Sequence, residues 1–331
     1  MSENYSGILV FTEQSEGKIH PISYELLNKA RELADQIDST VYAALLAPTG
    51  MEVGELVYHG ADRVYYLAND IFNQPLESQY QKQLLSLINE LKPEIILFGA
   101  SSFGRSLAPR ISASLKTGLT ADCTALEIDE EGKLVQIRPA FSENILAHIS
   151  TVSLPQIATI RYKEFPVNLR DERRKGEVIK KDVEIIEDSA VQVIEKLADN
   201  KVNISEAEVI VAGGRGVKNA EDFKLLQRLA DLTGGTIAAS RDLVDEGFIA
   251  REYQVGYSGS RVKPKIYFAC GISGAPQHIA GMKDSEIIIA INNNPSAPIF
   301  NIADYGIVGD LYEVIPALCE KISNGFKEVS S

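Results

Sequence analysis

The alternation of short apolar runs with segments of helical spacing most strongly constrains the fold of this chain. Ile8–Phe11, Val41–Ala47 and Glu94–Gly99 are short apolar runs of the kind found in buried strands. Ser23–Ile37 and Glu77–Leu91 repeat apolar residues along one helical stripe. This alternation predicts an α/β fold, with a mostly parallel sheet covered by helices on both faces.

The sequence pattern changes after Gly118. Thr124–Ile128 and Lys133–Pro139 flank the turn DEEG, which is typical of a hairpin. Ile149–Ile160 carries further strand-prone residues. We interpret these segments as an antiparallel extension of the parallel sheet.

A charge-dense segment, Lys163–Lys201, follows and separates two domains. Runs that mix both charge signs are typical of solvated faces or linkers. We therefore predict an N-terminal domain over residues 1–190, a linker over 191–206 and a second domain over 207–331.

The second domain repeats the alternation and is predicted to be another doubly wound α/β unit. Its expected strands are Glu208–Ala212, Thr236–Ala239, Lys265–Cys270 and Ile287–Ile291. Its expected helices are Asp222–Leu232, Ser273–Met282 and Asp310–Lys321.

Charge and composition exclude several classes of protein. The 331-residue chain has a net charge of −13, which argues against nucleic acid as a partner. Its three cysteines, Cys123, Cys270 and Cys319, have no metal-ligand spacing, so neither a metal site nor a disulfide framework is expected. The sequence has no apolar stretch of about 18 residues and no leader-like N-terminus, so we expect a cytoplasmic protein without membrane insertion.

Unusual turns follow the predicted strands of the second domain. Ligands of open α/β sheets bind beyond the carboxyl ends of the strands. The turn GGRG at Gly213–Gly216 combines close backbone approach with a cation, Arg215. Ser240-Arg241-Asp242 follows the next strand, and the polar loop Gln254–Pro264 precedes the third. Each turn alone is also explained by ordinary capping and surface loops.

The stretch from Gly271 to Asp310 is the richest in such turns. Gly271 and Gly274 lie directly after a strand and open a predicted helix, where backbone amides and the helix dipole favour a pyrophosphate. Asn292 stands at the end of a strand, and Asp310 either contacts a sugar hydroxyl or caps a helix. Together the turns predict one extended anionic ligand. The chain has no GxGxxG fingerprint for ordinary NAD binding.

Four segments of the second domain are VIVAGGRGVKNAEDF, AASRDLVDEGF, QVGYSG and GISGAPQHIAGMKDSEIIIAINNNPSAPIFNIADYGIVGD. Together they resemble the alpha subunit of electron transfer flavoprotein. ILFGASSFGRSLAPRISASLKTGLTADC is similar to the first domain of that family. The resemblance implies a heterodimer in which the second domain carries FAD and the first packs on a beta subunit. It also implies a second FAD or AMP in the beta subunit.

The resemblance carries site roles onto individual residues. It places Arg241 by the isoalloxazine ring, the Ser258 hydroxyl at flavin N5 and His278 near the pyrimidine edge, and these three would tune the flavin. A fixed arginine or a protonated histidine stabilises the charge of a reduced flavin. The remaining implied cofactor contacts are Arg215, Ser240, Gln254, Tyr257, Gly259, Ser273, Gly274, Ala275, Gln277, Asn292 and Asp310. The loop departs from the frequent VGQTGK pattern, with tyrosine and serine for the glutamine and lysine.

The resemblance implies electron transfer to or from acyl-CoA dehydrogenases in a bacterial cytoplasm. One version is a simple shuttle. The other is electron bifurcation from NADH, with ferredoxin or flavodoxin as a further partner, and Tyr257 weakly favours it. Two alternatives from other classes are a non-redox module that binds NAD or coenzyme A and an ATP-binding sensor of the universal-stress type. The sequence argues against the sensor, because it has no Gly-rich phosphate loop after Val10 or Leu46.

Overall fold

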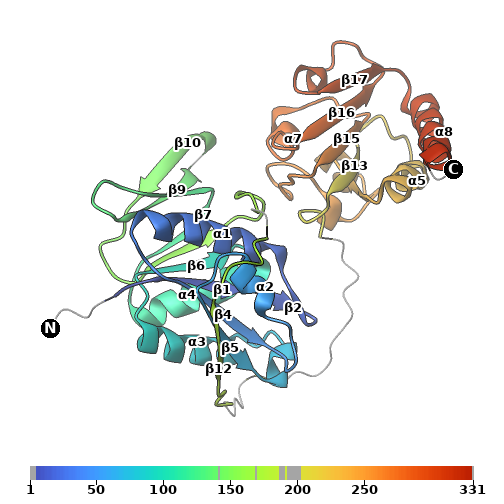
Figure 1. Ribbon diagram of the computed structural model, residues 1–331. Coiled ribbons are helices and arrows are strands. Elements are labelled where there is room, and N and C mark those ends of the chain that lie inside the picture. Colours follow the sequence, from blue (N-terminus) through green and yellow to red (C-terminus); the bar gives the residue numbers. More distant parts are fainter. Residues whose placement is uncertain (1–4, 141, 168–169, 186–190, 192–202, 330–331) are drawn as a thin grey trace. The chain divides into compact units, whose positions relative to one another are not determined.

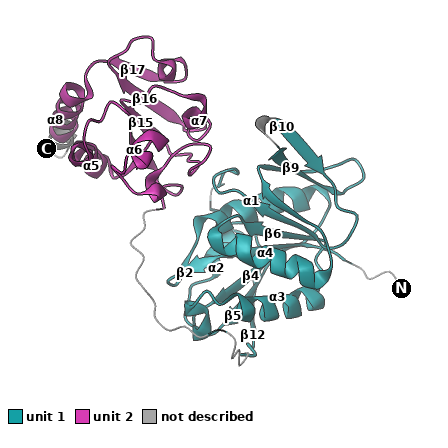
Figure 2. Cartoon of the chain, turned by 180° about the vertical axis from the view of Figure 1, so that it is seen from behind, with its two compact units in different colours: residues 1–194 teal, residues 195–331 magenta. Residues whose placement is uncertain are grey.

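The computed structural model, whose elements are labelled in Figure 1, has two compact units, residues 1–194 and 195–331, which Figure 2 shows in teal and magenta. The residues that it describes are 5–140, 142–167, 170–185, 191 and 203–329. Most of the linker predicted for residues 191–206 lies outside this described part.

Seven parallel strands form the main sheet of unit 1, in the order β12-β5-β4-β1-β6-β11-β7. Strands β1, β6 and β11 are buried along their whole length, as expected where both faces of a sheet are covered. The strand bounds are Ile8–Thr12 (β1), Val41–Ala47 (β4), Arg63–Ala68 (β5), Ile95–Gly99 (β6), Leu119–Cys123 (β7), Gln156–Ile160 (β11) and Glu177–Lys181 (β12).

Helices cover both faces of this sheet, which confirms the predicted α/β class. Successive residues of β1 point into two separate cores: Ile8 and Val10 pack with α1 and α2, and Leu9 and Phe11 pack with α3 and α4. Full burial of one such side chain contributes roughly 1.5–3 kcal/mol. The helix bounds are Pro21–Gln36 (α1), Gly54–Tyr58 (α2), Glu77–Leu91 (α3) and Ser102–Leu115 (α4).

The antiparallel extension is a separate sheet of order β10-β9-β8, with bounds Ser142–Ile149, Leu134–Ala140 and Ala125–Ile128. The prediction for Ile149–Ile160 was wrong in one respect. Within that stretch β11 is a parallel strand of the main sheet, between β6 and β7. Ile157 belongs to one core and Ala158 and Ile160 to the other, so β11 is held from both faces.

Part of the charge-dense segment is a strand and not a linker, although its side chains are largely exposed, as expected of a solvated face. Glu177–Lys181 forms β12, which pairs with β5 at the edge of the sheet. An edge strand has one free side, and charged residues on it protect that side from pairing with other chains. Charge density therefore did not exclude a strand here.

Unit 2 contains five parallel strands in the order β14-β13-β15-β16-β17. This confirms a second parallel-sheet unit. One strand, β17, lies inside the stretch that the sequence analysis treated as a turn. The bounds are Val209–Gly213 (β13), Thr236–Ala239 (β14), Ile266–Cys270 (β15), Ile287–Asn292 (β16) and Tyr305–Val308 (β17).

The two faces of this sheet are covered differently. Helices α5 and α8 pack on one face, while the other is covered mainly by loops and by short helix α7. The helix predicted over Ser273–Met282 is shorter in the structure. It begins at Pro276 and ends at Ile279, so it is a single turn. The helix bounds are Phe223–Thr233 (α5), Arg241–Asp245 (α6), Pro276–Ile279 (α7) and Leu311–Val329 (α8).

A buried carboxylate on α1 holds the segment that follows β11. Glu25 is 4% exposed, and its two oxygens accept the backbone N–H of Lys163 at 2.9 and 3.2 Å. Burial raises the pKa of Glu25 to about 7, aided by Glu164, although the N–H groups of Lys163 and Phe165 oppose the rise.

Because Glu25 binds its proton more tightly in the folded chain, its contribution to stability is present at low pH. That contribution is lost as the pH rises from about 4.5 to about 7. Across this pH window we expect the free energy of unfolding of the wild type to fall by up to about 3 kcal/mol, and that of Glu25→Gln to lack this fall. Urea titrations at several pH values measure both. The control Glu32→Gln changes an exposed residue of the same helix and should keep the pH dependence of the wild-type free energy of unfolding. Parallel curves for the wild type and Glu25→Gln would contradict this account.

Candidate functional site

The carboxyl ends of β13 and β15 form the switch point of the unit 2 sheet. The chain leaves β13 towards β14 and then crosses to β15 on the other side of β13. The turns after these strands are joined by hydrogen bonds from Gly214 N to Cys270 O (2.9 Å) and from Gly216 N to Gly271 O (3.1 Å). A Cβ on Gly214 would lie 2.6 Å from Gly271 O. These glycines therefore allow two turns to pack backbone against backbone.

The predicted cations lie on exposed turns at this edge, each beside a carboxylate. Arg215 Nε is 3.0 Å from Asp242, and Arg241 Nε is 3.1 Å from Asp245. All four side chains are more than half exposed. Exposed pairs of this kind contribute only about 0–1 kcal/mol, so both guanidinium groups remain available to an anionic ligand.

The loop after η3 (Arg251–Tyr253) folds back on itself and onto α7. Buried Gln254 donates from Nε2 to Ser258 Oγ at 3.1 Å, and Tyr257 N donates to Gln277 O at 2.8 Å. The Tyr257 ring is 57% exposed and faces the Arg261 guanidinium at 5.7 Å. The structure thus brings together four predicted contact residues, Gln254, Tyr257, Ser258 and Gln277, through one loop.

The turn from Gly271 to Gln277 presents backbone donors. Within the described part of the chain, the N–H groups of Ser273, Gly274, Ala275 and Gln277 donate to no acceptor. Gly274 has a φ of +89° and packs against Ile299 N, where a Cβ would lie at 2.3 Å. The single turn of α7 gives a weaker dipole than the predicted helix, so the donors themselves are the feature that suits a phosphate.

His278 is buried against a tyrosine that the sequence analysis missed. His278 is 6% exposed, and its Nε2 lies 2.9 Å from the hydroxyl of fully buried Tyr267. Burial lowers the pKa of His278 to about 4, so the ring is neutral near pH 7. Of the two groups that could stabilise the charge of a reduced flavin, a fixed arginine or a protonated histidine, this structure favours the arginine. A tyrosine inside the apolar run IYFAC was the signal that could have revealed the pair.

Two predicted contact residues also have structural partners. Asn292 donates from Nδ2 to Ile272 O at 2.9 Å and so ties the turn after β16 to the turn after β15. Asp310 Oδ1 accepts Tyr312 N at 2.9 Å at the start of α8, so the capping alternative is realised. β14 and β17 are the two edge strands of the sheet, and four inter-strand spacings, about 19 Å in all, separate them. Ser240 follows β14 and Asp310 follows β17, so only an extended ligand touches both.

Two of the buried side-chain polar atoms without a hydrogen-bond partner lie near this edge, and others lie in unit 1. Ser240 Oγ and His278 Nδ1 are buried and have no hydrogen-bond partner among the described residues. Buried polar atoms without partners are costly and rare. The exposed members of the predicted set are Arg215, Arg241, Tyr257, Ser258, Gly259, Ser273, Ala275, Gln277 and Asp310.

The switch point of the unit 1 sheet, between β1 and β6, is occupied by a carboxylate. Ser101 caps α4 by accepting Gly104 N at 2.9 Å and donates to Glu13 at 2.6 Å. Glu13 is 7% exposed. The Glu13 carboxyl group fills this position with oxygen acceptors, which do not suit a nucleotide phosphate, and this argues against the ATP-sensor alternative.

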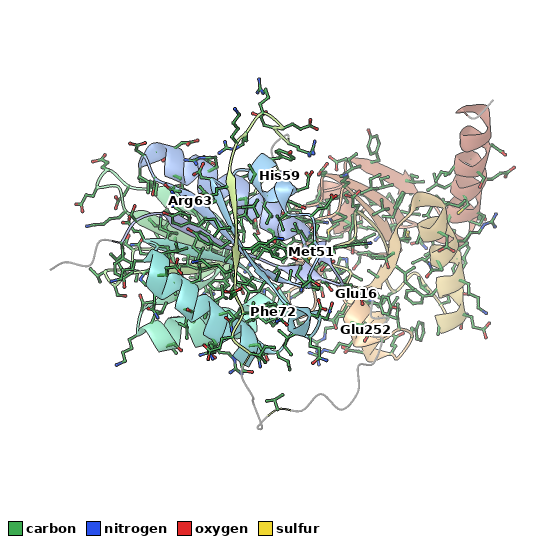
Figure 3. The ribbon with its side chains drawn as sticks, turned by 60° about the horizontal axis from the view of Figure 1, so that its bottom comes forward. Glu16, Met51, His59, Arg63, Phe72 and Glu252 are labelled. Carbon is green, nitrogen blue, oxygen red and sulfur yellow. The ribbon has the colours of Figure 1, made fainter. Side chains whose placement is uncertain are left out.

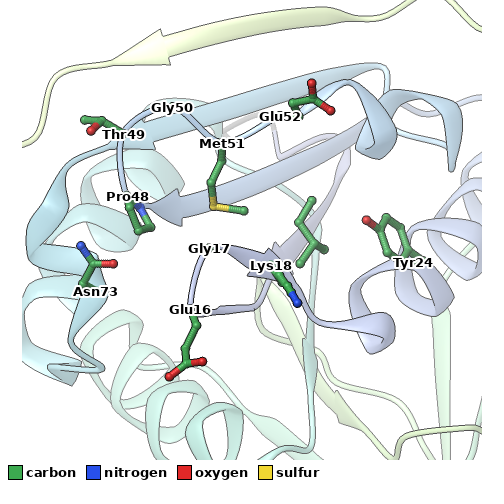
Figure 4. Close-up of a pocket in the computed structure, with 11 residues that line it drawn as sticks. Glu16, Gly17, Lys18, Tyr24, Pro48, Thr49, Gly50, Met51, Glu52 and Asn73 are labelled. Atoms are coloured by element: carbon green, nitrogen blue, oxygen red, sulfur yellow. The ribbon is translucent and has the colours of Figure 1, made fainter. Parts of the chain in front are cut away.

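An open pocket of about 580 Å³ lies elsewhere in unit 1. It is lined by the hairpin of β2 (Gln14–Ser15) and β3 (Lys18–Ile19) and by residues 48–52 after β4 (Figure 4). Glu16 and Met51 mark these two sides (Figure 3). Most of the polar side chains that line it are exposed on loops, and none of the predicted contact residues belongs to it.

The described residues contain neither a metal-ligand cluster nor a helix long and apolar enough to cross a membrane. Cys123, Cys270 and Cys319 are buried free thiols.

Comparison with known proteins gives matches along nearly the whole chain. Residues 8–186 match the electron transfer flavoprotein domain, and residues 203–283 match the electron transfer flavoprotein FAD-binding domain. The electron transfer flavoprotein subunit alpha of Thermoanaerobacterium thermosaccharolyticum is 47% identical, over 96% of this chain and 98% of that protein. The lactate dehydrogenase (NAD(+),ferredoxin) subunit LctC of Acetobacterium woodii is 46% identical, over 96% and 77%. Protein FixB of Clostridium saccharobutylicum is 45% identical, over 95% and 96%.

We expect Gly274→Ala to destabilise unit 2 by about 2–5 kcal/mol, because its Cβ meets backbone at a positive φ. Gly234→Ala is the matched control, since Gly234 also has a positive φ (+65°) but has open space around its Cβ position, and should cost about 1 kcal/mol. Urea unfolding followed by circular dichroism measures both. Equal costs would show that the packing of Gly274 against Ile299 is unimportant.

Proposed function

This chain belongs to the electron transfer flavoprotein alpha-subunit family, and we propose that it carries FAD on unit 2 and transfers electrons as one half of a heterodimer with a beta subunit. The observation that carries the proposal is the convergence of unsatisfied donors at one sheet edge, within the unit that matches the FAD-binding domain. When bound, FAD supplies the redox chemistry, and the protein supplies binding, orientation and electrostatics.

The proposed roles follow the chemistry of each turn. Ser273, Gly274, Ala275 and Gln277 would hold the pyrophosphate through backbone N–H groups, which need no charged side chain. Asn292 and Asp310 would lie towards the adenosine end. The distance along the sheet edge suits an extended dinucleotide.

The isoalloxazine ring would lie towards the β14 side of the edge. There Ser240 and Gln254 would hydrogen-bond its polar rim, and the Ser258 hydroxyl would address N5. Tyr257 and Gly259 would complete the loop around it. Arg241 and Arg215 would supply positive charge where a reduced flavin gains negative charge, because burial leaves His278 neutral.

For the wider reaction, we propose electron bifurcation from NADH in the bacterial cytoplasm. An acyl-CoA dehydrogenase would be one partner, and ferredoxin or flavodoxin the low-potential acceptor. The name of the LctC relative links that protein to NAD and ferredoxin, which supports this version. The beta subunit would then carry a second FAD, whereas AMP in its place would fit a simple shuttle.

Cofactor content and reactivity test the proposal directly. The heterodimer should purify yellow, release two FAD per dimer and lose flavin absorbance on titration with NADH. One FAD and no bleaching by NADH would refute bifurcation and leave the shuttle. A colourless protein that retains NAD or coenzyme A would refute flavin binding altogether.

Arg241→Ala should lower the reduction potential of the alpha-subunit flavin, because it removes positive charge beside a group that gains an electron. A charge-assisted hydrogen bond of about 1.5–3 kcal/mol corresponds to roughly 60–130 mV for one electron. Arg251→Ala is the control, since it removes an exposed cation of unit 2 outside the predicted set. Spectroelectrochemical titration measures both, and equal shifts would remove Arg241 from its proposed role.

A further inference from the structure

Tyr267 introduces one polar group into the loop-covered core of unit 2. Its side chain is fully buried among Ala269, Val255 and Met282, and its ring lies 6.1 Å from the His278 ring at an interplanar angle of 60°. Within the described part of the chain, the Tyr267 hydroxyl has one hydrogen-bond partner, His278 Nε2, at 2.9 Å. A buried phenol needs such a partner, so the pair is held together by the cost of separating it.

Both groups are neutral near pH 7. Burial raises the pKa of Tyr267 well above its ordinary value and lowers the pKa of His278 to about 4. The Val255 backbone and the charge of Asp242 favour the protonated ring, but burial outweighs both. The pair therefore shares two protons, one on the phenol oxygen and one on the imidazole.

Two arrangements of these protons are possible, and they differ in how many buried groups they leave unsatisfied. If Nε2 carries the proton and donates to the phenol, the phenol O–H has no acceptor and Nδ1 has no donor. If the phenol donates to Nε2, the proton lies on Nδ1, and only that N–H lacks a hydrogen bond of ordinary geometry. Each unsatisfied buried group costs about 1–3 kcal/mol, so the second arrangement is favoured.

The surroundings of Nδ1 support the same arrangement. A hydrogen bond between the ring and the Val255 backbone favours a proton on the ring. Val255 belongs to the loop that carries Gln254 and Ser258, so the imidazole links the buried tyrosine to that loop.

We propose that Tyr267 is a positioning residue that holds His278 as the neutral imidazole with its proton on Nδ1. The buried ring then carries a neutral N–H instead of a positive charge. Its consequence for the flavin rests on the proposed function: His278 contributes a hydrogen bond, and the arginines contribute the charge. The tautomer itself is a property of the protein alone.

The test is nitrogen NMR of the full chain copurified with its beta subunit and labelled with ¹⁵N-histidine. The chain has four histidines, and His278→Gln assigns the signal. The wild type should show one protonated nitrogen, Nδ1, and one unprotonated nitrogen, Nε2, unchanged from pH 8 to about pH 5. Tyr267→Phe should abolish this fixed pattern and shift the population towards a proton on Nε2, while Tyr305→Phe, at an exposed tyrosine of unit 2, should leave it intact.

A wild-type His278 that is charged at pH 7, or that carries its proton on Nε2, would overturn the proposal. The wild-type spectrum decides this even if Tyr267→Phe fails to fold. An unchanged pattern in a folded Tyr267→Phe would overturn it as well. The measurement needs no flavin, so a chain that binds none would refute the proposed function and not this assignment.

Discussion

The site depends first on the backbone contact between the turns after β13 and β15. Gly214 and Gly216 donate to carbonyl oxygens of the second turn, and side chains at these glycines would occupy the space that the contact needs. Because α5 and β14 separate the two turns in the chain, only the crossover of the sheet brings them together. The free N–H groups of Ser273, Gly274 and Ala275 are held in place by this contact and by Ile299.

Charge and burial are divided across the site. The interior contains neutral donors and acceptors, among them His278, Tyr267 and Gln254. The cations lie outside, each beside a carboxylate, where solvent and salt screen them. This division suits a ligand that has both an uncharged ring system and phosphates, because burial of an unpaired charge is costly and burial of a paired polar group is not.

The two units show how one architecture gives different sites. Both are parallel sheets with a switch point beside the first strand. In unit 1 that position contains the carboxylate of Glu13, hydrogen-bonded to Ser101. In unit 2 it contains glycine turns with free N–H groups. The difference lies in a few turn residues, as expected when function resides in sites and not in folds.

The sequence by itself determined the α/β class, most strands and the turns on which the predicted contact residues lie. It did so because apolar runs and helical periodicity are local properties of the chain. Only the tertiary structure decided that β11 is an internal strand, that charged Glu177–Lys181 pairs at an edge and that α7 is a single turn. The neutrality of His278 likewise required the structure, because it arises from burial and from Tyr267, eleven residues away on a neighbouring element. Burial and pairing are set by residues distant in sequence, and no local pattern contains them.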